Sequence, residues 1–391
     1  VLLYPVLIDA EQINAWAAPG GIVGIHLGLF VHSRDVHEYS SVLAHELAHL
    51  SQRHFARNVE AQQRMTLPTL IGFLAGAAIM AAGSSEAGMA AISGAQAIAQ
   101  SQRLRYSRGR EQEADRIGLT TLWRAGLDTD AMSRMFTRMQ RAYRFTERPP
   151  EFLLTHPVTE RRITDARNQS AGYEKLPVSR SLEYQLMRAR ARMHFADSGA
   201  KALEEAKNLT DDDVVNDYAL ALANDRAGMH DKALLLVQTL HLEDPGSILL
   251  CATFAELLIN ADKIEEATDL LAHRLVINPD NPPFAILYAR ALNASQRHDD
   301  AKDVLWRQAT IDEDDVDVWY DLAETAGLAG DIVAVHRARA EFFALNGDYQ
   351  NAIQHLQYAL SLVTKPSQRL TASLEQRLSD LRTEAEAARK T

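Results

Sequence analysis

The chain has 391 residues, of which 47% are hydrophobic, so it is long enough for two or three domains with cores of their own. A formal net charge of −11 argues against a nucleic-acid partner, because affinity for phosphates comes from Lys and Arg side chains. The single cysteine, Cys251, excludes an intramolecular disulfide and leaves the redox compartment open.

The charges are unevenly distributed along the chain. Residues 1–170 contain 18 Arg, no Lys and 16 acidic residues, a net of +2, whereas the remaining 221 residues carry 23 basic and 36 acidic groups, a net of −13. Such asymmetry indicates two domains, which we expect to span residues 1–170 and 171–391. The chain begins with Val and shows no basic signal region, so we expect the first domain to be truncated at its N-terminus.

The first 30 residues predict a small β-structure. The stretch "VLIDAEQINAWAAPGGIVGIHLGLFV" is rich in β-branched residues and interrupted by glycine, which indicates two short strands around a Pro-Gly-Gly turn at residues 19–21. A helix is expected next, capped by Ser40 or Ser41 and running to about Arg57, because its apolar residues recur at helical spacing.

This helix carries the stretch "HELAH". His45 and His49 are four residues apart and therefore share one helix face, so both imidazoles can bind one metal ion. Glu46 lies about 100° around the helix axis, which suits a general base that reaches a water molecule without binding the metal. The same pattern also arises by chance in apolar core helices, so a third ligand is needed.

An uncharged run, "MTLPTLIGFLAGAAIMAAGSS", lies between Arg64 and Glu86 and is long enough to span a bilayer. Its content of Gly, Ala, Ser, Thr and Pro makes its insertion into a membrane marginal. We favour a buried or lid-forming hairpin over a membrane-surface or transmembrane segment, and expect any membrane contact to be peripheral.

The stretch "SRGREQEADRIGL" predicts a charged helix in which Glu111 and Asp115 share a face. Glu111 can complete a His₂Glu metal site, and Asp115 can accept a hydrogen bond from a ligand imidazole. Glu113 points away from that face. Taken alone, the segment is more typical of a solvated helix face with Glu–Arg pairs.

The second half of the chain repeats with a period of 34 residues, which is typical of tetratricopeptide repeats. Small residues are needed where two antiparallel helices cross, and Pro ends a repeat because it cannot continue a helix. We expect five or six helix pairs over residues 180–364 and a polar capping helix; the alternative is a plain helical bundle. The recurring residues are Ala233, Ala267 and Ala301, and Pro245 and Pro279.

Together these motifs resemble the zinc metallopeptidase family that includes the CAAX prenyl protease and the HtpX-type heat-shock proteases. The resemblance rests on "NAWAAPGG" ahead of "HELAH", with "SRGREQEADRIG" about sixty residues later. The chain is especially similar to bacterial periplasmic members of this family that append tetratricopeptide repeats. With these members, the resemblance covers essentially the whole chain. It implies a mainly α protein, with a small α+β zincin-like metalloprotease domain and an α-solenoid, and one Zn²⁺ held by His45, His49 and Glu111.

The resemblance also directs attention to "LLTHPVTERR". Family members carry a His followed six residues later by an Arg near the active site, as His156 and Arg162 do here. This implies that His156 can take the fourth zinc position and hold the enzyme inactive; the following Pro157 favours an extended loop that can swing. Glu46 is then the general base, and Arg162 or a displaced His156 stabilises the oxyanion.

Two functions remain as alternatives. The first, implied by the resemblance, is a periplasmic zinc endopeptidase that degrades misfolded or stalled outer-membrane clients and assists their assembly. The second is a repeat-scaffold chaperone or adaptor whose zinc site is latent or structural.

By resemblance, the partners are protein substrates and the β-barrel assembly machinery, bound on the concave face of the acidic solenoid. The stretch "AWAAPGGIVGIHL" is expected to present an edge strand to substrate.

Overall fold

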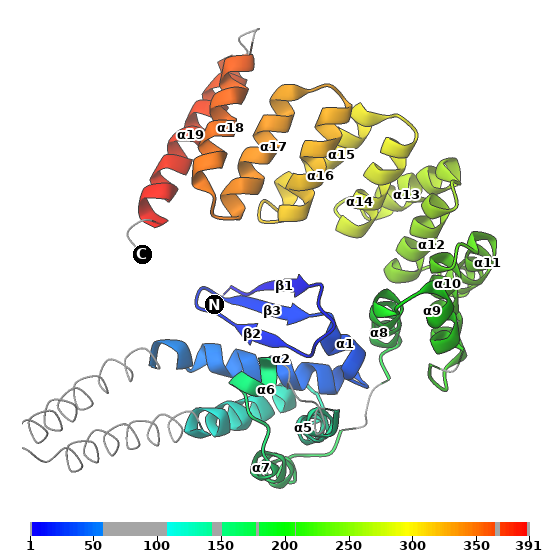
Figure 1. The fold of residues 1–391 in the computed structure, drawn as a ribbon, viewed down its shortest axis with the longest axis vertical. Helices are drawn as coiled ribbons and strands as arrows, with labels where there is room; N and C mark the ends of the chain where they lie inside the picture. The colour runs from blue at the N-terminus through cyan, green and yellow to red at the C-terminus, as the bar shows by residue number, and fades with distance from the viewer. Residues whose placement is uncertain are drawn as a thin grey trace, which may run out of the picture. The chain divides into compact units, whose positions relative to one another are not determined.

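The computed structural model describes residues 2–57, 108–142, 151–176, 180–207, 209–363 and 368–388 (Figure 1). Their contacts form two compact units, residues 1–197 with 209–215 and residues 198–208 with 216–391. The expected mainly α fold is confirmed. The uncharged run between Arg64 and Glu86 lies outside the described residues. Among the helices that are described, none is both long enough and apolar enough to cross a bilayer.

A three-stranded sheet opens the first unit, in the order β1-β3-β2. Strand β3 (Ile22–His26) pairs in parallel with β1 (Tyr4–Ile8) and antiparallel with β2 (Ala15–Ala17). The two strands that the sequence predicted around this turn are confirmed as β2 and β3, and the structure adds β1, which the sequence analysis did not predict. Strand β1 is mostly exposed and has no alternating pattern or preceding turn signal, which is why it was missed.

Helix α2 (Val36–Ser51) begins earlier than expected. Its N-cap is Asp35, whose carboxylate accepts a hydrogen bond from the Glu38 N–H at 2.8 Å, so the prediction of a cap at Ser40 or Ser41 was wrong. An acidic cap is favourable because it satisfies a free N–H and complements the helix dipole.

The same helix also ends earlier than residue 57. Gln52 is its C-cap, and Arg53 adopts a left-handed conformation with φ 51°, after which residues 54–57 form a short helical stretch. The expected single helix is therefore interrupted, and the stretch at 54–57 takes a new direction.

Helix 108–124 packs against α2 at a point of very close approach. Gly118 permits this approach, because a Cβ there would lie 3.3 Å from the backbone nitrogen of His45 and 3.4 Å from the carbonyl carbon of Ala44. The contact brings Glu111, on the same helical stretch, opposite the two histidines of α2.

Three further helices complete this core: α5 (Asp130–Ala142), α6 (Glu151–Thr155) and α7 (Glu160–Ser170). Helix α5 lies between α2 and α7 and buries an apolar face on them. Each large side chain buried there stabilises the fold by about 1.5–3 kcal/mol relative to exposure. These side chains, all at most 2% exposed, are Met132, Met135, Phe136 and Met139.

Helix α8 (Leu182–Phe195) packs on α1 (Gly28–His32) within the first unit. The ring of Tyr184 lies 5.8 Å from Phe30 and 5.7 Å from Tyr39, measured between centroids. The compact units thus divide beyond α8, whereas the sequence analysis divided the domains at residue 170. The domain bounds 1–170 and 171–391 stay a prediction.

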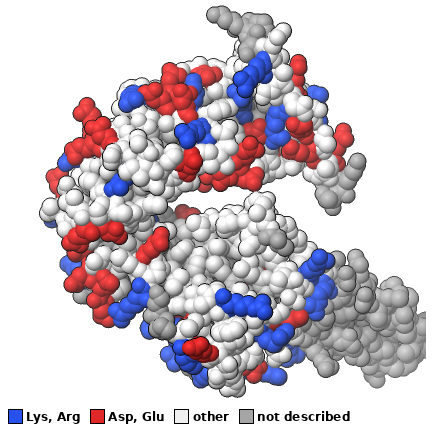
Figure 2. All heavy atoms as spheres, turned by 180° about the vertical axis from the view of Figure 1, so that it is seen from behind, with Lys and Arg blue, Asp and Glu red and all other residues white. Residues whose placement is uncertain are grey.

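The second unit is a solenoid of helix pairs, as predicted (Figure 1). The three alanines of the 34-residue repeat, Ala233, Ala267 and Ala301, are fully buried at the helix crossings. Acidic side chains are spread over these helices (Figure 2). The helices are α9 (Gly199–Ala206), α10 (Asp213–Arg226), α11 (His230–Glu243), α12 (Ile248–Asn260), α13 (Ile264–Ile277), α14 (Pro282–Ala294), α15 (His298–Ile311), α16 (Val316–Leu328), α17 (Ile332–Leu345), α18 (Tyr349–Leu362) and α19 (Gln368–Ala388).

The 34-residue period is also present in the backbone. Four residues with positive φ recur at this interval, and each follows the first helix of a pair. A left-handed residue at this place ends a helix and lets the chain reverse. The four are Gly228 at 74°, Asp262 at 59°, Gln296 at 60° and Gly330 at 72°.

Candidate metal centre

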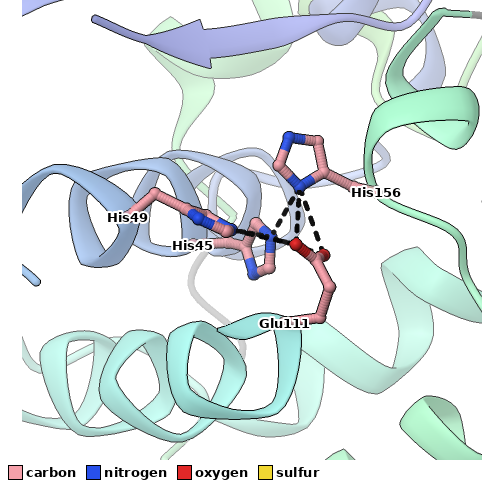
Figure 3. Close-up of side chains that lie close together, drawn as sticks. All are labelled: His45, His49, Glu111 and His156. Atoms are coloured by element: carbon pink, nitrogen blue, oxygen red, sulfur yellow. Dashed lines mark hydrogen bonds and ion pairs between the residues drawn. The ribbon is translucent and has the colours of Figure 1, made fainter. Parts of the chain in front are cut away.

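Three segments of the first unit bring four potential metal ligands together (Figure 3). His45 and His49 come from successive turns of α2, Glu111 from the described helical residues 108–124, and His156 from the residue directly after α6. One ligand atom from each lies within 4.8 Å of all the others. His45 is fully buried and Glu111 is 6% exposed, whereas the side chains of His49 and His156 are 15% and 14% exposed.

The spacing of these atoms suits the ligands of a single metal ion. Nε2 of His45 lies 3.1 Å from Nε2 of His49 and 3.4 Å from Oε2 of Glu111. Nδ1 of His156 lies 3.3 Å from Nε2 of His45 and 3.2 Å from both carboxylate oxygens of Glu111. Ligands held about 2.1 Å from a tetrahedral zinc ion are about 3.4 Å apart. The donor set of three imidazoles and a carboxylate therefore fits zinc.

His45 is oriented by a carboxylate on its outer side. Its Nδ1 lies 2.9 Å from Oδ1 of Asp115, one helical turn beyond Glu111. Burial alone would lower the pKa of His45, but the carboxylates of Asp115 and Glu111 outweigh it and raise that pKa to about 9. The structure thus places Asp115 beside His45, and its expected role as hydrogen-bond acceptor for this imidazole stays a prediction.

Arg162 faces the carboxylates rather than the open side of the cluster. It is 4% exposed, and its Nη1 lies 2.9 Å from Oε2 of Glu111 and donates to the carbonyl of Pro157 at 3.0 Å. Its other side contacts Asp115. This geometry suits a residue that positions Glu111, and it gives no support to the expected contact with an oxyanion.

Glu46 lies beside the cluster without joining it. The residue is 2% exposed, and burial raises the pKa of its carboxyl group. Its Oε1 lies 3.6 Å from Nε2 of His156. His156 thus presents one ring nitrogen to the potential metal ligands and the other to Glu46.

The structure also places two residues near His49 for which the sequence analysis gave no role at the site. Nδ1 of His54 lies 2.9 Å from Nδ1 of His49, and Nε2 of His54 lies 3.2 Å from Oε2 of Glu113. Burial lowers the pKa of His49 to about 4 and also lowers that of His54. No pattern indicated this contact, because residues five apart do not share a face of a regular helix.

A cavity of about 840 Å³ opens beside the cluster and reaches Glu46, His49, Glu111 and His156. Strand β2 and the turn after it form one wall, and the end of α2 forms another. Much of the lining is apolar, so the cavity can accept hydrophobic side chains of an extended peptide. The large apolar residues that line it are Leu2, Tyr4, Trp16, Leu50 and Phe55.

Comparisons with known proteins show similarity to a family of peptidases. The model of peptidase family M48 matches residues 4–170, which include every ligand described above. A putative beta-barrel assembly-enhancing protease of Vibrio cholerae is 35% identical over 364 residues, covering 91% of this chain and 75% of that protein. The beta-barrel assembly-enhancing protease of Escherichia coli K12 is 33% identical over 363 residues, covering 91% and 74%. The mitochondrial metalloendopeptidase OMA1 of Bos taurus is 32% identical over 157 residues, covering 39% and 29%.

Proposed function

Because this chain belongs to peptidase family M48, we propose that it is a zinc endopeptidase of outer-membrane protein quality control. It degrades misfolded or stalled β-barrel proteins in the periplasm and assists their assembly through its repeat helices. The observation that carries the proposal is that ligand atoms of His45, His49, Glu111 and His156 lie within 4.8 Å of one another, beside the carboxylate of Glu46. The names of the relatives support the client class.

The proposed mechanism assigns the proton transfers to Glu46. His45, His49 and Glu111 would hold one zinc ion, which would supply a Lewis acid and lower the pKa of a water molecule to about 7. Glu46 accepts a proton from the attacking water and returns it to the leaving amine. Its raised pKa makes it a better base than an exposed carboxylate.

His156 holds the proposed enzyme in a resting state. Its Nδ1 lies among the ligand atoms of the cluster and its Nε2 faces Glu46, so it would fill the fourth ligand position of the zinc ion and block access to the base. Displacement of His156 opens that position, and the freed imidazole is then placed to stabilise the oxyanion. We assign Arg162 a different role, which is to position Glu111 and Asp115.

Substrate binding uses the edge of the small sheet. Within the described residues, β2 pairs on one side only, with β3, and it borders the cavity beside the ligand cluster. An extended peptide that adds to β2 as a further strand places its carbonyl groups near Glu46. The repeat helices, within the proposed domain 171–391, bind clients or the β-barrel assembly machinery through their concave face.

The alternative is a repeat scaffold with a latent zinc site, which the obstruction by His156 favours. One experiment separates the two functions: cleavage of casein and of an unfolded outer-membrane β-barrel protein by the His156→Ala variant, with and without Glu46→Gln. If the protein is an endopeptidase, the variant with Glu46→Gln should still bind zinc, and its cleavage rate should fall by about 10²–10⁴-fold. Cleavage that persists in the double variant would show that Glu46 is not the base. Absence of zinc-dependent cleavage in His156→Ala would favour the scaffold.

A further inference from the structure

His54 contacts the side of His49 that faces away from the ligand cluster. Nε2 of His49 points into the cluster, 3.4 Å from Oε1 of Glu111, whereas its Nδ1 lies 2.9 Å from Nδ1 of His54. His54 is 3% exposed, so this contact is shielded from competing water. On its far side, Nε2 of His54 lies 3.2 Å from Oε2 of Glu113.

These contacts permit one consistent placement of the ring protons. A His49 that binds a metal through Nε2 carries its proton on Nδ1, and that N–H needs an acceptor. Nδ1 of His54 is an acceptor only when the His54 proton is on Nε2. That proton is then directed at the carboxylate of Glu113, which can only accept while it is ionised.

We propose that His54 is a positioning residue for the metal ligand His49, and that Glu113 anchors it. The hydrogen bond from Nδ1 of His49 fixes the tautomer and the ring plane that present Nε2 to the metal. The inference rests on the proposed function only in taking His49 as a ligand of zinc. Nδ1 of His45 lies next to the carboxylate of Asp115. Nδ1 of His49, by contrast, is linked to the carboxylate of Glu113 through the imidazole of His54.

The break at the end of α2 makes this contact possible. In an uninterrupted helix, a residue five positions beyond His49 lies about 140° around the axis and points away from it. The left-handed conformation of Arg53 ends the helix and redirects the chain at residue 54. Arg110 donates to the carbonyl of His54 at 3.3 Å and Arg57 to Glu113 at 3.2 Å, which holds the redirected turn against helix 108–124.

The test is zinc affinity, measured by competition with a chromophoric chelator. Replacement of an imidazole that orients a zinc ligand typically lowers metal affinity by about 10–100-fold, which is the result expected for His54→Leu. His54→Asn retains an acceptor oxygen near the position of Nδ1 and is expected to recover most of the affinity. The absorption spectrum of bound Co²⁺ should shift in His54→Leu and return towards wild type in His54→Asn.

His37→Leu is the matched control, because His37 is also a buried histidine of α2 but accepts from the Asp128 N–H, away from the cluster. It should lower thermal stability with less than about twofold change in zinc affinity.

Glu113→Ala, at a partly exposed position, provides a folded variant in which a smaller affinity loss is expected. Wild-type affinity in His54→Leu, or an equal loss in His37→Leu, would overturn the inference. A wild type that binds zinc but cleaves nothing would contradict only the proposed function.

Discussion

The guanidinium of Arg162 forms a bidentate ion pair with the carboxylate of Asp115: Nε donates to Oδ2 at 2.8 Å, and Nη2 donates to Oδ1 at 2.7 Å. Both residues are 4% exposed, so the pair is desolvated. Since Asp115 also lies 2.9 Å from Nδ1 of His45, the orientation of a proposed zinc ligand depends on a residue 117 positions further along the chain.

Arg162→Lys is expected to keep the positive charge but lose the two parallel hydrogen bonds, because an ammonium group has no planar fork. Zinc affinity should fall by about 10–100-fold, as for other changes behind a metal ligand. Arg162→Leu should cost about 3–5 kcal/mol in the free energy of unfolding, since it leaves Asp115 buried without its ionic partner. Chelator competition and denaturant unfolding measure the two effects. A Lys variant with wild-type affinity would show that the fork has no role in positioning.

His156→Ala is expected to raise basal proteolysis, because it removes the imidazole that lies on the ligand cluster and beside Glu46. Three ligands remain, so the variant should still bind zinc. Initial rates on an unfolded β-barrel client measure the effect. Leu154→Ala, at an exposed position on α6, is the neighbouring control and should leave the rate unchanged. Equal rates in His156→Ala and wild type would remove the proposed inhibitory role of His156.

Gln296→Gly should stabilise the solenoid. Gln296 adopts φ 60°, where a side chain costs about 1–2 kcal/mol that glycine does not incur, while the equivalent position in the next repeat is Gly330. After the entropy of the unfolded glycine is subtracted, a gain of about 0.5–1 kcal/mol in the free energy of unfolding is expected. Gly330→Ala should destabilise by a similar amount. Denaturant titration of both variants checks the signs, and destabilisation by Gln296→Gly would contradict the prediction.

The repeat helices should lose stability as the pH falls below about 6.5. His336 on α17 and His355 on α18 lie with their Nδ1 atoms 2.8 Å apart, and burial lowers the pKa of both from the usual value of 6.5. The unfolded chain therefore binds protons more readily than the folded chain. The stability that the two neutral histidines contribute above pH 6.5 is lost on acidification. The difference in melting temperature between about pH 7.5 and about pH 5.5 should shrink in His336→Phe.

Tyr358→Phe is the control for this prediction, because Tyr358 contacts both histidine rings and the substitution leaves both imidazoles in place. It should show the same pH dependence as wild type. An unchanged pH dependence in His336→Phe would mean that this pair does not contribute.

The sequence by itself determined the features that depend on local periodicity. His45 and His49 share a face because a helix repeats every 3.6 residues, and the 34-residue recurrence of Ala233, Ala267 and Ala301 requires a stack of similar helix pairs. Glu111 and Asp115 were selected as one face of a second helix by the same rule. These predictions needed no knowledge of how distant segments pack.

Only the tertiary structure decided which of these faces meet and what lies behind them. The parallel pairing of β1 with β3, the orientation of Arg162 towards Asp115 and the contact of His54 with Glu113 each join residues separated by other elements. The turn at Arg53 shows why local patterns could not reveal the last contact: one left-handed residue redirects the chain, and long-range packing selects the partner it then meets.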